Sequence, residues 1–147
     1  MKKTSIQRRL KLFFLKLARA RASTLEIAWG AAIGTFISVF PTFGFGILLV
    51  FLLHRFFKFN LMAALALSVI SNPFTSPFFM VLSYNIGSAI TGNEIAFNID
   101  NWKENLSDTG IILLVGALIV SSAASIIAYF VVKYSVQEYR MRKENKA

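Results

Sequence analysis

Long stretches without a charged residue dominate the chain and alternate with short charged stretches. The three apolar segments are residues 27–53, 59–93 and 109–132. Each is long enough to cross a hydrocarbon core about 30 Å thick, which takes about 20 helical residues. Runs of this length favour a membrane span over the core helix of a soluble domain, so the pattern predicts an all-α membrane protein.

The first two segments are each interrupted near the middle, whereas the third is not. Proline lacks a backbone donor and glycine ends helices readily, so both segments are predicted to be broken helices. The freed backbone groups must find partners inside the protein, because lipid offers none. Segment 109–132 is predicted to be one straight transmembrane helix. The interrupting residues are Pro41, Gly44 and Gly46 in the first segment and Pro73 and Pro77 in the second.

Residues 1–22 are predicted to form a basic amphipathic helix on the membrane surface. Five apolar residues share one face at helical spacing, with basic residues around the rest. They are Ile6, Leu10, Phe13, Phe14 and Leu17. A soluble helix bound to a partner stays open as the alternative.

After residues 1–22, Ser23 and Glu26 have capping-box spacing, which predicts that a new helix begins there and gives Glu26 a structural role.

Basic residues are concentrated at the two ends of the chain. The net charge is +9, mean hydropathy is +0.60, eight basic residues precede Glu26, and five more follow segment 109–132 in the basic tail, residues 133–147. Flanking basic clusters are typical of proteins held at anionic lipid, and no nucleic-acid partner is expected. The chain has no cysteine and one histidine, so no metal site and no cofactor are predicted. The sequence shows no pair of titratable groups of the kind that general acid–base catalysis needs, so no enzyme is predicted.

The charge pattern also predicts a topology. Three simple crossings would place the two basic termini on opposite sides, against the rule that basic flanks stay in the cytoplasm. Segment 27–53 is therefore predicted to be re-entrant, because Arg55 and Lys58 follow it. Segment 59–93 then crosses outward, the acidic loop 94–108 lies outside, and the membrane domain 23–132 ends with a returning span. A simple crossing by the first segment stays open, as does the choice of which broken segment turns back.

The broken regions supply the candidate binding site. Two interrupted apolar segments resemble the paired broken helices of transporters, where unwound backbone lines a polar site. The alternative is that these residues only satisfy the backbone freed by proline. The candidates are Pro41, Thr42, Gly44, Asn72, Pro73, Thr75, Ser76 and Pro77.

Small residues recur every four positions on two of the segments. This spacing lets helix backbones approach closely and predicts helix-packing faces. The residues are Gly30, Gly34 and Ser38 on the first segment and Ser121 and Ser125 on the third.

Two motifs carry a resemblance to a known family. The run from Gly34 to Gly44, GTFISVFPTFG, is followed by ISNPFTSP from Ile70 to Pro77. In this order they resemble the bacterial membrane family known as domain of unknown function 2062. The resemblance implies a multi-pass protein of the bacterial inner (plasma) membrane; some relatives carry glycosyltransferase-like domains, and the family brings no established activity.

Two functions compete at this point. The first is a protein that binds or moves a lipid or small solute through a polar site at the two broken helices, with its basic surface holding anionic head groups. The second is a non-transporting adaptor or scaffold for a membrane-bound partner complex. A chain of this size is expected to form a homo-oligomer or to bind a membrane protein partner.

Overall fold

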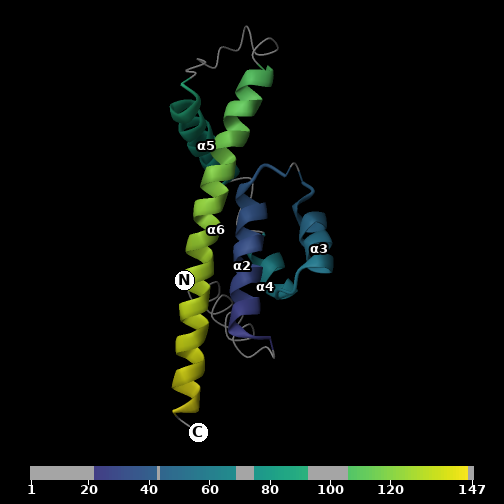
Figure 1. The fold of residues 1–147 in the computed structure, drawn as a ribbon, viewed down its shortest axis with the longest axis vertical. Helices are drawn as coiled ribbons and strands as arrows, with labels where there is room; N and C mark the ends of the chain where they lie inside the picture. Colours follow the sequence, from purple (N-terminus) through teal and green to yellow (C-terminus); the bar gives the residue numbers. More distant parts are fainter. Residues whose placement is uncertain (1–21, 43, 69–74, 93–105, 146–147) are drawn as a thin grey trace, which may run out of the picture.

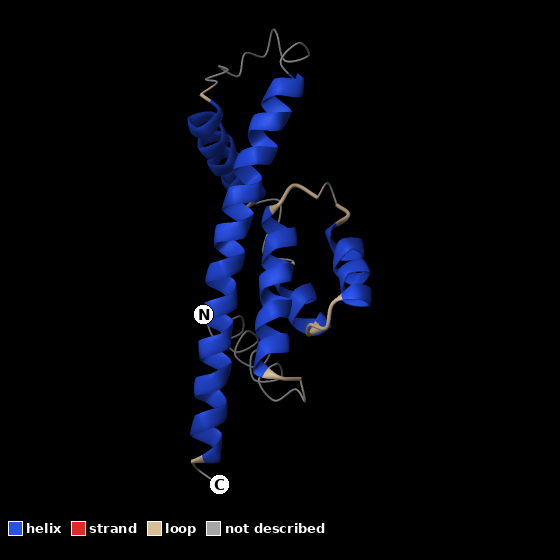
Figure 2. Ribbon diagram, viewed as in Figure 1, coloured by secondary structure: helices blue, strands red, loops and turns tan. Residues whose placement is uncertain are grey.

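The computed structural model describes residues 22–42, 44–68, 75–92 and 106–145. These residues form five helices and contain no strand (Figures 1 and 2). The all-helical fold class is therefore confirmed for the described part of the chain. The predicted surface helix at 1–22 and most of the acidic stretch 94–108 lie outside it.

Helix α6 (Leu106–Glu144) is the longest of the described helices, and two other helices pack along it. Its 39 residues correspond to about 58 Å of helix. Helices α2 (Thr24–Val39) and α5 (Ser76–Thr91) pack against different levels of it, while α4 (Leu61–Leu67) and α3 (Gly46–Phe56) lie on the far side of α2 (Figure 1). The apolar segment 109–132 and the basic tail thus share one continuous helix, which begins three residues before the predicted span.

Helix α2 begins and ends where local chemistry requires. The Glu26 amide donates to Ser23 Oγ at 3.1 Å, and the Ser23 amide donates to Glu26 Oε2 at 2.8 Å, which confirms the capping box. At the other end Phe40 is extended, with φ −68° and ψ 137°. Proline disfavours the helical region for the residue before it, so Pro41 favours the end of the helix at Phe40.

After α2 the chain turns back on itself. The Phe45 amide donates to the Thr42 carbonyl at 3.0 Å, and Gly44 has a φ of +92°, which favours glycine. Helix α3 then runs back beside α2 (Figure 1). The Asn60 amide, just after α3, donates to the carbonyl of Glu26 at 2.8 Å. The two ends of segment 27–53 therefore lie together, and the segment is a helical hairpin.

The second apolar segment contains two helices, α4 and α5, of which α4 packs against α2 and α5 packs against α6. Asn60 Oδ1 accepts the Ala63 amide at 2.8 Å and caps the short helix α4. Helix α5 starts beyond Thr75 with Pro77 in its first turn and ends at Gly92, whose φ is +69°. In Figure 1, α4 lies beside α2, whereas α5 lies at the opposite half of α6.

Small residues set the helix contacts. A Cβ at Gly30 or Gly34 would overlap the carbonyls of Asn60 and Ala64, so α2 and α4 touch through their backbones. On the other side of α2, Ser125 Oγ donates to the Ala32 carbonyl at 3.0 Å. These contacts pack α2 tightly between α4 and α6.

Among the described residues, one helix is long and apolar enough to cross a membrane, Thr109–Glu144. Helices α2 and α3 are apolar but shorter. Helix α2, with 16 residues, is about 24 Å long.

Candidate binding cavity

A cavity of about 390 Å³ lies where the end of α2, the start of α3, the start of α5 and the middle of α6 meet. Pro41, Thr42 and Gly44 of the first broken motif line it, and Ser76 of the second lines it from the other side. Two regions that are separated in the sequence by helices α3 and α4 thus share one space.

The remaining candidates that the structure describes, Thr75 and Pro77, do not line this cavity. Thr75 is the residue before α5, and Pro77 is exposed on its first turn. Asn72 and Pro73 lie outside the described residues.

The lining is neutral. Its polar side chains are five hydroxyls, and the remaining lining residues are apolar side chains and two glycines. Of these hydroxyls, Ser68 Oγ donates to the Leu65 carbonyl at 2.8 Å, and Ser38 and Ser76 also have partners. The hydroxyls belong to Ser38, Thr42, Ser68, Ser76 and Ser83.

Two helix starts add backbone donors to this lining. Helix α3 begins after Phe45 and α5 begins after Thr75, and neither start has a side-chain cap hydrogen bond or an acidic residue in its first turn. Unbonded amides at a helix start can donate hydrogen bonds to a polar atom of a ligand. The arrangement can hold a molecule by apolar contact and neutral hydrogen bonds. No titratable side chain in the lining offers proton transfer, and the described residues contain no cluster of three or more potential metal ligands.

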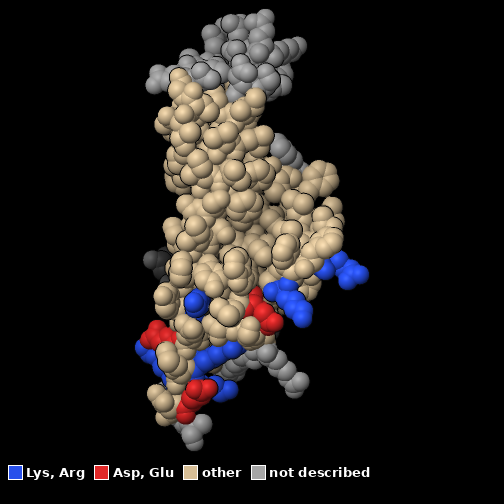
Figure 3. All heavy atoms as spheres, in the orientation of Figure 1, with Lys and Arg blue, Asp and Glu red and all other residues tan. Residues whose placement is uncertain are grey.

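The charged side chains that the structure describes lie away from the cavity (Figure 3). In Figure 3 the described lysine, arginine and acidic residues gather at one end of the molecule, below a surface free of charge. Twelve residues of α2 separate Ser38 from Glu26, a rise of about 18 Å. Sixteen residues of α6 separate Ala117 from Lys133, a rise of about 24 Å.

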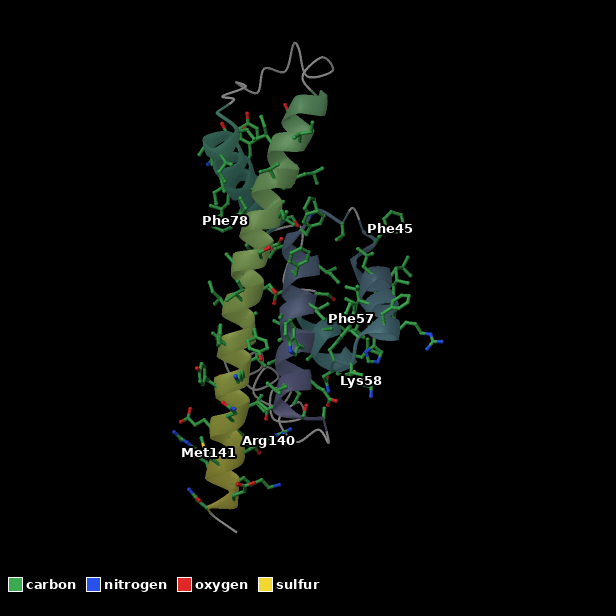
Figure 4. The ribbon with its side chains drawn as sticks, in the orientation of Figure 1. Phe45, Phe57, Lys58, Phe78, Arg140 and Met141 are labelled. Atoms are coloured by element: carbon green, nitrogen blue, oxygen red, sulfur yellow. The ribbon has the colours of Figure 1, made fainter. Side chains whose placement is uncertain are left out.

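Arg140 fixes the charged end of α6 to the start of α2. Its guanidinium donates to the Ala22 carbonyl at 2.8 Å and to Thr24 Oγ1 at 3.3 Å (Figure 4). Above it, Trp29 meets Tyr129 edge-on with ring centroids 5.2 Å apart. Aromatic residues next to basic ones are typical of a membrane interface.

The small-residue stripes face inward. Gly30 and Gly34 contact α4, Ser121 is fully buried, and Ser125 bonds to α2. Ser38, in the same stripe as the two glycines, lines the cavity instead.

Sequence reasoning missed the contact between α5 and α6 that closes one side of the cavity. A Cβ at Gly116 would overlap the Ser83 carbonyl, and one at Gly87 would overlap the Ile112 carbonyl. The four-residue spacing of Ser83 and Gly87 was an available signal for close packing. Ser68, Leu113 and Ala117 carried no comparable signal, because only the tertiary fold brings them to the cavity.

Comparison with known proteins identifies the family of this chain but no individual relative. The family described as an uncharacterised protein conserved in bacteria (DUF2062) matches residues 7–145. No curated protein and no solved structure matches the chain.

Proposed function

The chain belongs to this uncharacterised bacterial family, and on that premise we propose that it is an integral inner-membrane protein that binds a bilayer-derived molecule in the cavity between its two broken segments. The observation that carries the proposal is the neutral cavity itself. It joins Pro41 and Thr42 of one broken segment to Ser76 of the other.

The described surface supports insertion in a membrane. Large apolar side chains are exposed along α3, α5 and the apolar part of α6, among them Leu48, Phe78 and Ile127, each more than 60% exposed. A soluble monomer rarely exposes so much contiguous apolar surface. Lipid would cover these faces, while the charged end lies among head groups and water.

The hairpin formed by α2 and α3 supports the re-entrant topology. The Asn60–Glu26 hydrogen bond holds the end of the hairpin beside its beginning. Helix α2 is also shorter than the hydrocarbon core of about 30 Å, so the hairpin tip lies inside the membrane. Helices α4 and α5 then cross outward in two pieces and α6 returns, which leaves both basic termini in the cytoplasm.

Binding is favoured over catalysis by the chemistry of the lining. Hydroxyls and helix starts orient a ligand but do not transfer protons at neutral pH, and a cavity of about 390 Å³ is within the size range of small-molecule sites. The basic end is suited to hold anionic head groups of surrounding lipid. We do not favour the adaptor function, because the small-residue faces on which it relied are used inside the chain.

The test is native mass spectrometry of the full chain extracted gently with its lipids. Wild-type protein should retain a small molecule, and the spectrum also gives the number of subunits. Ala117→Leu adds a side chain into the cavity and should remove that molecule, because Ala117 lines the cavity and is 1% exposed. Ala123→Leu, on the exposed face of the same helix, is the matched control and should retain it. Equal retention by both variants would contradict the proposal.

A further inference from the structure

The most informative feature of the cavity is the combination of its lining and its mouth. We infer that it takes the hydrocarbon chain of a membrane lipid, which enters sideways from the bilayer between the hairpin tip and α5, while the head group stays outside. This inference rests on the proposed function and names the class of ligand.

The lining excludes a charged head group. None of the sixteen described residues that line it is ionisable. Among the described lysines and arginines on the helices that form it, the nearest along its helix is Arg55, eight residues beyond Ile47 on α3, or about 12 Å. A phosphate placed in the cavity would therefore lose its hydration without gaining a countercharge, which is strongly unfavourable.

The hydroxyls do not make the cavity a polar site of the usual kind. Ser68 is bonded to its own helix, and Ser38 and Ser76 are also engaged. What remains facing the space is mainly aliphatic and aromatic carbon, from residues such as Phe79 and Leu113. Hydrocarbon gains dispersion contacts with such a lining.

The mouth of the cavity opens on apolar surface. Three lining residues are exposed, namely Gly44, Ile47 and Met80, and the last two are 54% and 52% exposed. Phe45, next to Gly44, and Phe78, two residues before Met80, are 62% and 65% exposed and lie on opposite sides of the molecule in Figure 4. In the proposed topology this surface faces lipid, so a molecule from the bilayer reaches the cavity directly.

One side of the mouth is weakly held. Val50 is the one buried residue of α3, and it packs in a cluster with Ile37, Phe59 and Ala64. Helix α3 can therefore move away from α5 without opening the contacts of α2 with α4 and α6. Such a displacement gives a chain a route inward that removes one buried side chain, Val50, from the core.

The test uses two photoreactive phospholipids in reconstituted full-length protein, one with a diazirine in the acyl chain and one with it in the head group. Ser83 and Ala117 are the diagnostic positions, because both line the cavity and are only 2% and 1% exposed. The chain probe should label them, and the head-group probe should not. Labelling of Ile127, exposed on α6, reports ordinary lipid contact in every sample.

Blocking the mouth should reduce the diagnostic labelling alone. Met80→Trp and Ile47→Trp act from opposite sides, and we expect either to lower labelling of Ser83 and Ala117 by about tenfold. Val81→Trp and Leu48→Trp are matched controls, since each is an exposed neighbour that does not line the cavity. Equal labelling in all four variants would overturn sideways entry.

The two proposals fail in different ways. If the head-group probe labels Ser83 and Ala117 and the chain probe does not, the ligand class is wrong and the binding function stands. If neither probe labels them and no molecule is retained in mass spectrometry, the proposed function fails as well.

Discussion

At the scale of single residues, glycine sets how closely α5 and α6 approach. Gly116 lies against the Ser83 carbonyl, and Gly87 lies against the backbone of Ile112. The cavity wall formed by Ser83 and Ala117 depends on this distance, because both residues lie at the same crossing.

Gly116→Ala should therefore destabilise the protein by about 1–3 kcal/mol, the usual cost of overpacking. Gly110→Ala is the control on the same helix, where an added Cβ meets nothing within 4 Å. It should be neutral or stabilise by up to about 1 kcal/mol, because alanine is the better helix former. Thermal unfolding in detergent measures both. A shift of the two variants in the same direction would count against the close crossing.

Local patterns predicted part of this detail. The capping box was predictable because both of its hydrogen bonds join residues three apart. The spacing of Gly30 and Gly34 predicted close packing but not the partner, which is α4 of the same chain. Gly116 was not predicted, since its partner Ser83 lies on another helix and no spacing within one helix reveals such a pair.

At the scale of elements, the hairpin tip determines where the cavity forms. Pro41 ends α2 and Gly44 turns the chain, so the first turn of α3 faces the same space as the last turn of α2. The prolines and glycines predicted an interruption here. Together with the basic residues after the segment they predicted a chain that turns back, with a simple crossing left open, and the Asn60–Glu26 hydrogen bond shows that the two ends of the segment lie together.

Gly44→Ala tests the turn. A φ of +92° is unfavourable for a residue with a Cβ, and we expect a loss of about 1–2 kcal/mol in the free energy of unfolding. An added Cβ would meet nothing within 4 Å, so conformational strain is the only cause. The measurement is again the unfolding temperature in detergent. An unchanged temperature would show that the turn tolerates ordinary residues.

The long helix α6 shows a different limit of sequence reasoning. Hydropathy divides residues 109–132 from the basic tail, but backbone hydrogen bonding continues through the change in composition from Leu106 to Glu144. Hydropathy reports the surroundings of a helix, whereas its ends depend on caps and breakers. None of the three prolines lies in this region, and the helix continues.

At the scale of the whole molecule, the described charged residues and the cavity lie at different positions along the long axis (Figure 3). The order of charged and apolar stretches predicted the basic end, because each residue of a helix adds a fixed rise along its axis. The cavity was predicted only as a meeting of two broken motifs. Its volume, its neutral lining and the contribution of α6 depend on tertiary packing, which no single segment encodes.

The central claim is that segment 27–53 enters and leaves the membrane by the same face, so that its tip forms the cavity inside. The native chain has no cysteine, so single cysteines at Lys3, Lys58 and Asp100 can be labelled with a membrane-impermeant reagent. The account predicts that positions 3 and 58 react from the cytoplasmic face and position 100 from the opposite face. Reaction of positions 3 and 58 from opposite faces would make the first segment a simple crossing and contradict the account.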